Sequence, residues 1–151
     1  MCVIIHCETS DRPDFETLEK CEVRNPHGIG LAWRESGKLR YWKTNDLISA
    51  YDKAISIKGE MIIHLRWASA GGVCNELRHP FPITRTVTTR RSGSAKTLLF
   101  QNGTVTGWRK LLGQLEFRAD FPEGEISDTR LTAYILSLPA SRGRFRQILG
   151  M

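Results

Sequence analysis

The sequence lacks a long hydrophobic run; the apolar stretch near Met61-Ile62-Ile63, for example, is soon interrupted by His64 and Arg66. A membrane-spanning helix needs about 18 or more consecutive apolar residues, so none is expected. The first residues also lack the basic lead and the apolar stretch of a secretory signal peptide. We therefore expect a cytoplasmic protein that has no contact with a membrane.

The cysteines and histidines also lack the spacing of metal ligands. The four cysteines, Cys2, Cys7, Cys21 and Cys74, include no Cys-x2-Cys pair, and the four histidines complete no familiar ligand set. We therefore expect no metal and no other cofactor. Cytoplasmic thiols stay reduced, so Cys7, Cys21 and Cys74 are interpreted as small packing residues.

Aromatic residues make up only 9% of the chain and are not interleaved with its basic residues. The net charge is +6, and much of the surplus lies in two arginine clusters: Arg85, Arg90 and Arg91, and Arg142, Arg144 and Arg146. Single-stranded nucleic acids are bound on aromatic stacking platforms within basic grooves. Without such platforms, we interpret the clusters as a solvated hairpin tip and a polar tail, and nucleic acid is not the expected partner.

The rest of the composition is that of an ordinary single globular domain, with 151 residues, 40% of them hydrophobic and 25% charged. Hydrophobic patterning predicts strands over 2–7, 29–34, 38–43, 59–66, 82–89 and 96–101, and helices over 13–22, 46–56, 108–115 and from 127 to about 138. We expect Thr44 or Asn45 to cap the second helix and Ser127-Asp128 to cap the last. Residues 67–80 are expected to form a long connection, and 90–94 the tip between the last two strands. This mixture predicts an α+β domain.

Cys2 has a position with chemical consequences. Its small side chain permits removal of Met1, which would leave an N-terminal cysteine with a free α-amine. An α-amine has a pKa of about 7.7–8.0, so it can accept the proton of its own thiol near neutral pH. Nucleophile and base then lie on one residue, as in N-terminal-nucleophile enzymes.

Three further places offer the groups that amide hydrolysis of an amino acid needs. Asn102 and Gly103, at an expected strand end, can direct a side-chain amide and a main-chain N–H at a developing oxyanion. Arg66, at another strand end, has a planar guanidinium that suits a carboxylate. Asp128, at a helix start, can bind an ammonium group. Each is open to a simpler interpretation as a turn, an exposed arginine or a helix cap.

Taken in order, these residues and their neighbours resemble the class II glutamine amidotransferases. The resemblance rests on Cys2, Arg24-Asn25-Pro26-His27-Gly28-Ile29-Gly30, His64-Leu65-Arg66-Trp67-Ala68-Ser69, His79-Pro80-Phe81, Gln101-Asn102-Gly103 and Ser127-Asp128-Thr129. It covers residues 2–136 and implies one type-2 amidotransferase domain over 1–151. The fold it implies is the αββα sandwich of antiparallel sheets of N-terminal-nucleophile hydrolases. Because the chain is short for this family, we expect a compact or incomplete sandwich.

The resemblance also implies a role for each matched residue. Cys2 matches the nucleophile, and Asn102 and Gly103 match the oxyanion hole. The substrate-binding positions are Arg66 for the α-carboxylate of glutamine, Asp128 for its α-ammonium, and Trp67, Ser69 and Arg24 around them. Structural positions near the site are His79, Gly28 and Gly30.

The implied activity is hydrolysis of the glutamine side-chain amide through a Cys2 thioester. The ammonia would pass to an acceptor on a partner synthetase, and the chain can also form an oligomer. The main alternative is a catalytically inactive or immature domain of the same fold that acts as a binding or regulatory module. Hydrolysis of a different amide and association with nucleic acid remain further alternatives.

Overall fold

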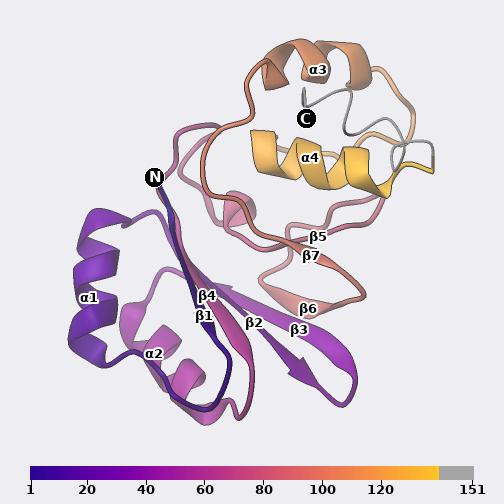
Figure 1. Cartoon of the computed structure of the whole chain (residues 1–151). Coiled ribbons are helices and arrows are strands. Elements are labelled where there is room, and N and C mark those ends of the chain that lie inside the picture. Colours follow the sequence, from indigo (N-terminus) through magenta and orange to yellow (C-terminus); the bar gives the residue numbers. More distant parts are fainter. Residues whose placement is uncertain (140–151) are drawn as a thin grey trace.

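The computed structural model describes residues 1–139 and has an α+β fold, as predicted (Figure 1). Its strands are β1 (Val3–Cys7), β2 (Ile29–Glu35), β3 (Lys38–Thr44), β4 (Met61–Leu65), β5 (Phe81–Pro82), β6 (Ser92–Ala95) and β7 (Leu98–Leu99). Its helices are α1 (Phe15–Arg24), α2 (Leu47–Ser56), the short 3-10 helix η1 (Asn75–Leu77), α3 (Trp108–Leu115) and α4 (Asp128–Ser137). No helix among the described residues is long and apolar enough to cross a membrane.

The main sheet has five antiparallel strands in the order β1-β4-β2-β3-β6. Strands β2 and β3 form the predicted hairpin, whose turn contains Gly37 at a φ of 75°. The chain then returns through α2 to β4, which lies between β1 and β2. This order matters for the site, because it places the N-terminus of β1 beside the C-terminal end of β4.

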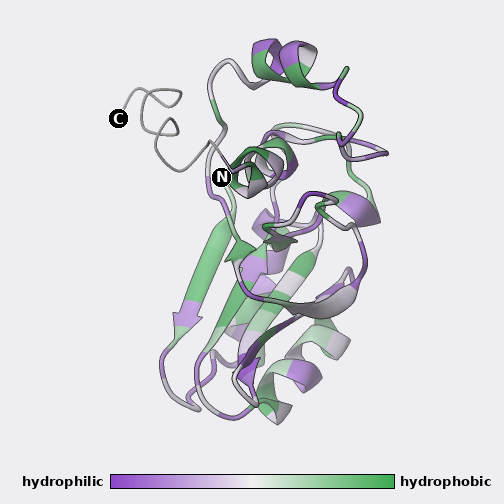
Figure 2. Cartoon of the chain, turned by 90° about the vertical axis from the view of Figure 1, so that its right-hand side faces the viewer, coloured by the Kyte–Doolittle hydropathy of each residue, from purple (hydrophilic) through white to green (hydrophobic). Residues whose placement is uncertain are grey.

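One face of this sheet is covered by α1 and α2, which Figure 1 shows on the same side of β1 and β4. Alternating residues of the strands, such as Leu31 and Ile63, are buried against Leu18 of α1 and Ala50 and Ala54 of α2. Figure 2 shows hydrophobic residues concentrated in the strands, whereas the helices mix hydrophobic and hydrophilic positions. Burial of this apolar face is the main source of stability for the first half of the chain.

The second half of the chain forms its own layer and its own core. The two-stranded sheet β5–β7 lies next to α4, and α3 lies beside α4 (Figure 1). Phe81, Leu131 and Tyr134 are among the fully buried residues of this second core. The outer face of the main sheet meets this layer through Gly30, where an added Cβ would collide with the carbonyl of His79.

The strands predicted over 82–89 and 96–101 are far shorter in the structure, and the prediction of the tip between them was wrong. Of those two ranges only Pro82, in β5, and Leu98–Leu99, which form β7, are strand residues, and β5 pairs with β7. The expected tip at 90–94 instead contains most of β6, which pairs with β3. The threonine-rich stretch after Pro82 favours a strand by composition, but it turns instead. Val87 is fully buried with a φ of 35°, and its N–H donates to the Thr84 carbonyl. Tertiary packing of Val87 therefore overrides local propensity.

The helix predictions were confirmed apart from one cap. Ser127 caps α4 as expected, accepting a hydrogen bond from the Arg130 N–H. Helix α2 is capped by Asp46, whose carboxylate accepts from the Ser49 N–H, and not by Thr44 or Asn45. The predicted polar tail at 142–146 lies outside the described residues.

Candidate functional site

The thiol of Cys2 lies against the main chain that follows β4. The register of β1 on β4 pairs Val3 with Leu65, so Cys2 stands opposite the residues just beyond Leu65. The Trp67 N–H donates to Cys2 Sγ at 3.3 Å, and Sγ donates to the Trp67 carbonyl at 3.5 Å. Met1 is 88% exposed, so the residue whose removal would free the Cys2 amine is accessible.

A small pocket opens beside Cys2 and contains about 250 Å³ of space, part of it open solvent. Its walls come from the N-terminus, the end of β4 and the loop after it, the segments before β5 and after β7, and the start of α4. The lining residues are Cys2, Arg66, Trp67, Ser69, Ala70, His79, Gln101, Gly103, Ser127, Asp128 and Thr129. Residues that are far apart in sequence thus meet around one thiol.

Arg66 is buried in the pocket wall with only 3% of its surface exposed. Its guanidinium donates to the carbonyls of Gly72 at 3.0 Å and Ala70 at 3.3 Å, so the loop after β4 wraps around it. Burial lowers the pKa of Arg66, and the nearby Cys74, Cys2 and Asp128 oppose that effect. A guanidinium has five N–H donors, so donors remain for a ligand after these two bonds.

Asp128 supplies the carboxylate of the pocket and is 4% exposed. One oxygen accepts from the Gln101 side-chain amide and the Val105 N–H, each at 2.9 Å. The other accepts from the Thr129 N–H at 2.8 Å. With the Thr129 hydroxyl at 3.4 Å, four donors hold the carboxylate in place at the start of α4, and those from Gln101 and Val105 tie the 101–105 segment to that helix.

The segment expected to form the oxyanion hole lies at the pocket, but its two residues differ in placement. Gly103 lines the pocket with a φ of 108°, and an added Cβ would meet no atom there, so its main chain borders open space. Asn102 is exposed and is not among the lining residues. The Gln101 carbonyl lies 3.4 Å from His64 Nε2, which anchors the segment to β4.

Two buried imidazoles lie behind the pocket. His79 lines it and is 4% exposed, and its ring lies 4.3 Å from that of His64, which is fully buried. Burial lowers the pKa of His64 to about 4 and that of His79 well below its usual value. Both rings are therefore neutral near pH 7 and support the wall without adding charge.

The outer rim of the pocket is held by contacts between loops. The Ser69 hydroxyl lies 2.8 Å from the Thr104 hydroxyl, which joins the loop after β4 to the segment after Gly103. Trp67 is 44% exposed and its ring lies 5.1 Å from that of His27. His27 also accepts from the Ala68 N–H at 2.8 Å, so the connection between α1 and β2 supports this rim.

The remaining predicted residues lie away from the pocket surface. Gly28 has a φ of 114°, and an added Cβ would collide with the Arg78 side chain, while Gly30 lies against the His79 carbonyl. Both glycines let the two layers approach. Arg24 ends α1, is exposed, and is not among the residues that line the pocket.

Two residues of the site were missed by sequence reasoning. Gln101 binds Asp128, and its place directly before Asn102 was the available signal. Glu125 accepts from the Gly72 N–H at 2.6 Å and from Cys74 Sγ at 3.3 Å, and so fixes the loop around Arg66. An isolated acid in a loop gives no signal of such a role.

Among residues 1–139, no three histidine, cysteine, aspartate or glutamate side chains gather in a way that could hold a metal ion. No family model matches this chain, and no curated protein or solved structure is significantly similar to it. The function is therefore argued from the geometry of the pocket and from the resemblance of its motifs.

Proposed function

We propose that the chain is a glutamine amidotransferase domain of the N-terminal-nucleophile type, with the αββα sandwich of that class in a compact form. The observation that supports this best is the meeting of Cys2, Arg66 and Asp128 in one pocket. A nucleophile, a cation and an anion placed together match the amide, the α-carboxylate and the α-ammonium of glutamine.

The proposed reaction begins when Met1 has been removed. The α-amine takes the proton of the Cys2 thiol, and the thiolate attacks the side-chain amide carbon of glutamine. The Gly103 N–H, with the Asn102 amide turned inward, stabilises the oxyanion. The C–N bond then breaks, the ammonium form of the α-amine protonates the departing nitrogen, and ammonia leaves. Water hydrolyses the thioester, which releases glutamate and restores the thiol.

The other predicted residues bind the substrate in this scheme. Arg66 pairs with the α-carboxylate, Asp128 with the α-ammonium, and Ser69 adds a hydroxyl beside the carboxylate. Trp67 covers the pocket, and Arg24 supports the region near the N-terminus. The ammonia passes to an acceptor on a partner synthetase. A thiol nucleophile works only when reduced, so we place the protein in the cytoplasm.

The test is glutamate release from glutamine by protein whose intact mass shows loss of Met1. We expect release by the wild type and none by Cys2→Ala. Cys21→Ala is the matched control, because Cys21 is a free, partly buried cysteine like Cys2, and it should release glutamate as the wild type does. A glutamine-mimicking diazoketone should add one adduct to the wild type and none to Cys2→Ala. Unchanged glutamate release by Cys2→Ala would exclude the assignment.

A second candidate function is a binding module with the same fold. It is favoured by the contacts of the pocket's charged groups, because Asp128 already accepts four hydrogen bonds and Arg66 donates two. This candidate predicts that Met1-free protein binds glutamine in calorimetry without releasing glutamate. Glutaramate, which lacks the α-amine, should bind more weakly in either case if Asp128 recognises the ammonium.

A further inference from the structure

A second and larger groove lies apart from the Cys2 pocket and shares no lining residue with it. It contains about 1910 Å³ of space, including open solvent, and lies among β3, β6, the 84–90 segment, the 119–123 segment and α4. Its walls carry guanidinium and hydroxyl groups, so its chemistry differs from that of a hydrophobic docking site.

Arg130 gives this groove a fixed positive charge. It is 3% exposed, and its guanidinium donates to three main-chain carbonyls, those of Val87, Glu125 and Glu123. These are neutral acceptors, and no carboxylate is within ion-pair distance of Arg130 among the described residues. A guanidinium keeps its proton in proteins, so the charge of Arg130 is not cancelled by a partner.

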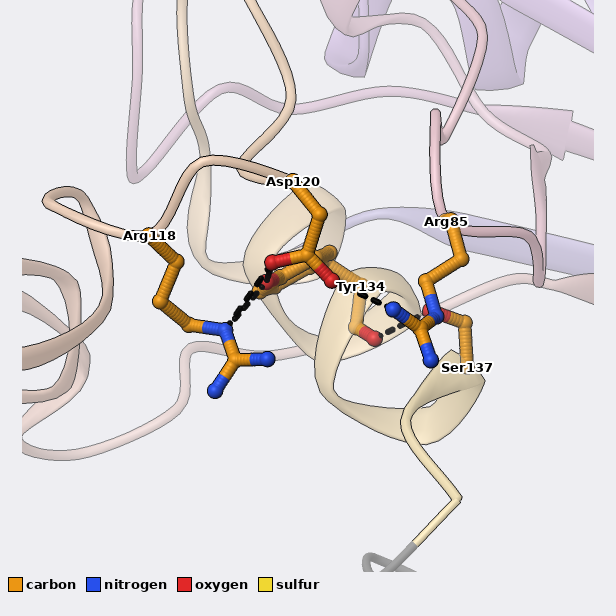
Figure 3. A network of polar contacts seen from close by, with 5 residues as sticks. All are labelled: Arg85, Arg118, Asp120, Tyr134 and Ser137. Carbon is orange, nitrogen blue, oxygen red and sulfur yellow. Dashed lines mark hydrogen bonds and ion pairs between the residues drawn. The ribbon is translucent and has the colours of Figure 1, made fainter.

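Two carboxylates line the groove, those of Asp120 and Glu123, and the first is shared between two arginines. Figure 3 shows Asp120 held by Arg85 and Arg118, with Tyr134 as a further donor. Arg85 lies at 2.5 Å, Arg118 at 3.0 Å and the Tyr134 hydroxyl at 2.8 Å from the Asp120 oxygens. The hydrogen bonds from Arg118 and Tyr134 lower the pKa of Asp120 to about 2. Because two guanidinium groups share one carboxylate, the group of Arg85, Arg118 and Asp120 is positive overall.

Two more arginines of the groove are accessible to a ligand. Arg90 is exposed, and among the described residues no carboxylate lies within ion-pair distance of it. Arg40 pairs with Glu35 at 3.1 Å, and both side chains are about half exposed. An exposed pair of this kind contributes little, about 0–1 kcal/mol, so a ligand carboxylate can replace Glu35.

Strand β6 gives the groove a free sheet edge. It pairs with β3 on one side, and no other strand of the described chain pairs with it. Its residues Ser92 and Ser94 are exposed and line the groove. A free edge offers main-chain N–H and carbonyl groups that an extended peptide can pair with. The flanking Arg90, Arg91 and Lys96 would repel the same edge of a second copy of this chain, and they favour an acidic strand.

We propose that this groove binds an acidic, extended segment of a protein partner, which adds as a strand to β6 and pairs its carboxylates with Arg90 and Arg40. Nucleic acid fits less well, because the aromatic residues of the groove wall offer little open ring for stacking: Tyr41 is only 2% exposed, and Phe121 is half-buried with its ring packed edge-on against that of Tyr134. The proposal does not depend on the chemistry of Cys2.

The test measures binding of short fluorescein-labelled peptides to the full chain by fluorescence anisotropy. The probe is a peptide of alternating Glu and Val. Its comparisons are a Lys-Val peptide, a Glu-Val peptide with N-methylated main-chain amides that cannot pair as a strand, and an oligothymidine of equal charge. We expect the Glu-Val peptide to bind most tightly and salt to weaken it.

The variants Arg90→Glu and Arg109→Glu make the same change of charge at two exposed arginines, one in the groove and one on α3. We expect Arg90→Glu to weaken the Glu-Val peptide about tenfold and Arg109→Glu less than about twofold. Equal loss in both variants would overturn the groove as the site. Equal binding of the N-methylated peptide would overturn strand addition, and tighter binding of oligothymidine would assign the groove to nucleic acid instead.

Discussion

Lys43 places an amine in the packed region between the two layers. It is 1% exposed, its Nζ has no hydrogen-bond partner, and the Nζ lies 4.7 Å from the centre of the Phe81 ring. Burial, followed by the charges of Arg130 and Arg78, lowers the pKa of Lys43 to about 7. A buried cation without an ion-pair partner lowers the stability of the folded state.

We predict that Lys43→Met stabilises the protein, and that the gain is larger at pH 6 than at pH 10. Below pH 7 the lysine is charged in both the folded and unfolded states, so the whole cost of burying the charge is present. Between pH 7 and about 10.4 the unfolded chain binds more protons, so wild-type stability rises with pH. The expected gain at pH 6 is on the order of 2 kcal/mol in urea unfolding.

The control for this comparison is Lys38→Met, which makes the same substitution at an exposed position of the same strand. Its unfolding free energy should differ from that of the wild type by a similar small amount at both pH values. A gain for Lys43→Met that is equal at pH 6 and pH 10 would contradict a charge-burial origin. The hairpin pattern predicted the strand but gave no signal that this lysine is buried, because burial comes from a layer formed by later residues.

At the scale of elements, the loop after β4 depends on one acid for its position. Glu125 binds the Gly72 N–H and Cys74 Sγ, and this holds the carbonyl of Gly72 against Arg66. We predict that Glu125→Ala speeds hydrogen exchange of the Gly72 amide about tenfold or more, because the amide loses its acceptor. If the proposed function holds, the KM for glutamine also rises while the protein remains folded.

Glu123→Ala is the matched control, because its side chain is exposed and it contributes only its main-chain carbonyl to Arg130. It should leave the exchange of Gly72 within about twofold of the wild type. Protection of Gly72 that is unchanged in Glu125→Ala would show that Arg66 alone fixes the loop.

The elements also show where sequence reasoning succeeds and where it fails. The β2–β3 hairpin and α4 have strong local signals, a glycine turn and a Ser127 cap, and both were confirmed. Strand β6 has the sequence Ser-Gly-Ser-Ala, which carries no apolar alternation. It is a strand because β3 provides a partner and because Gly93 leaves room for the Tyr41 side chain, where an added Cβ would be 2.9 Å from the hydroxyl oxygen.

The same distinction applies to the candidate site. The meeting of Cys2 with the end of β4 follows from pairing two strands that were both predicted. The bond between Gln101 and Asp128 depends on how the 101–105 segment crosses the start of α4, and no local pattern encodes that crossing. The motifs therefore named residues that meet at the pocket, such as Cys2, Arg66 and Asp128, together with Asn102 and Arg24, which do not line it. The contacts that hold the pocket together required the structure.

At the scale of the whole molecule, the two cores are joined where the outer face of the main sheet meets the segment before β5. Gly30 lies at this junction, and an added Cβ would collide with the main chain at His79 and approach Pro80. Main chain cannot move aside as a flexible side chain can, so the two layers would have to separate locally. The Cys2 pocket takes walls from both layers, and it would change with them.

We predict that Gly30→Ala lowers the free energy of unfolding by about 1–3 kcal/mol, measured in urea, because it overpacks the junction. Gly113→Ala is the matched control, since it makes the same change in the middle of α3 with no atom near the new Cβ. It should raise stability by up to about 1 kcal/mol, because alanine favours a helix over glycine. A stabilising Gly30→Ala would mean that the layers do not pack through this contact, and the shared walls of the pocket would then lose their structural basis.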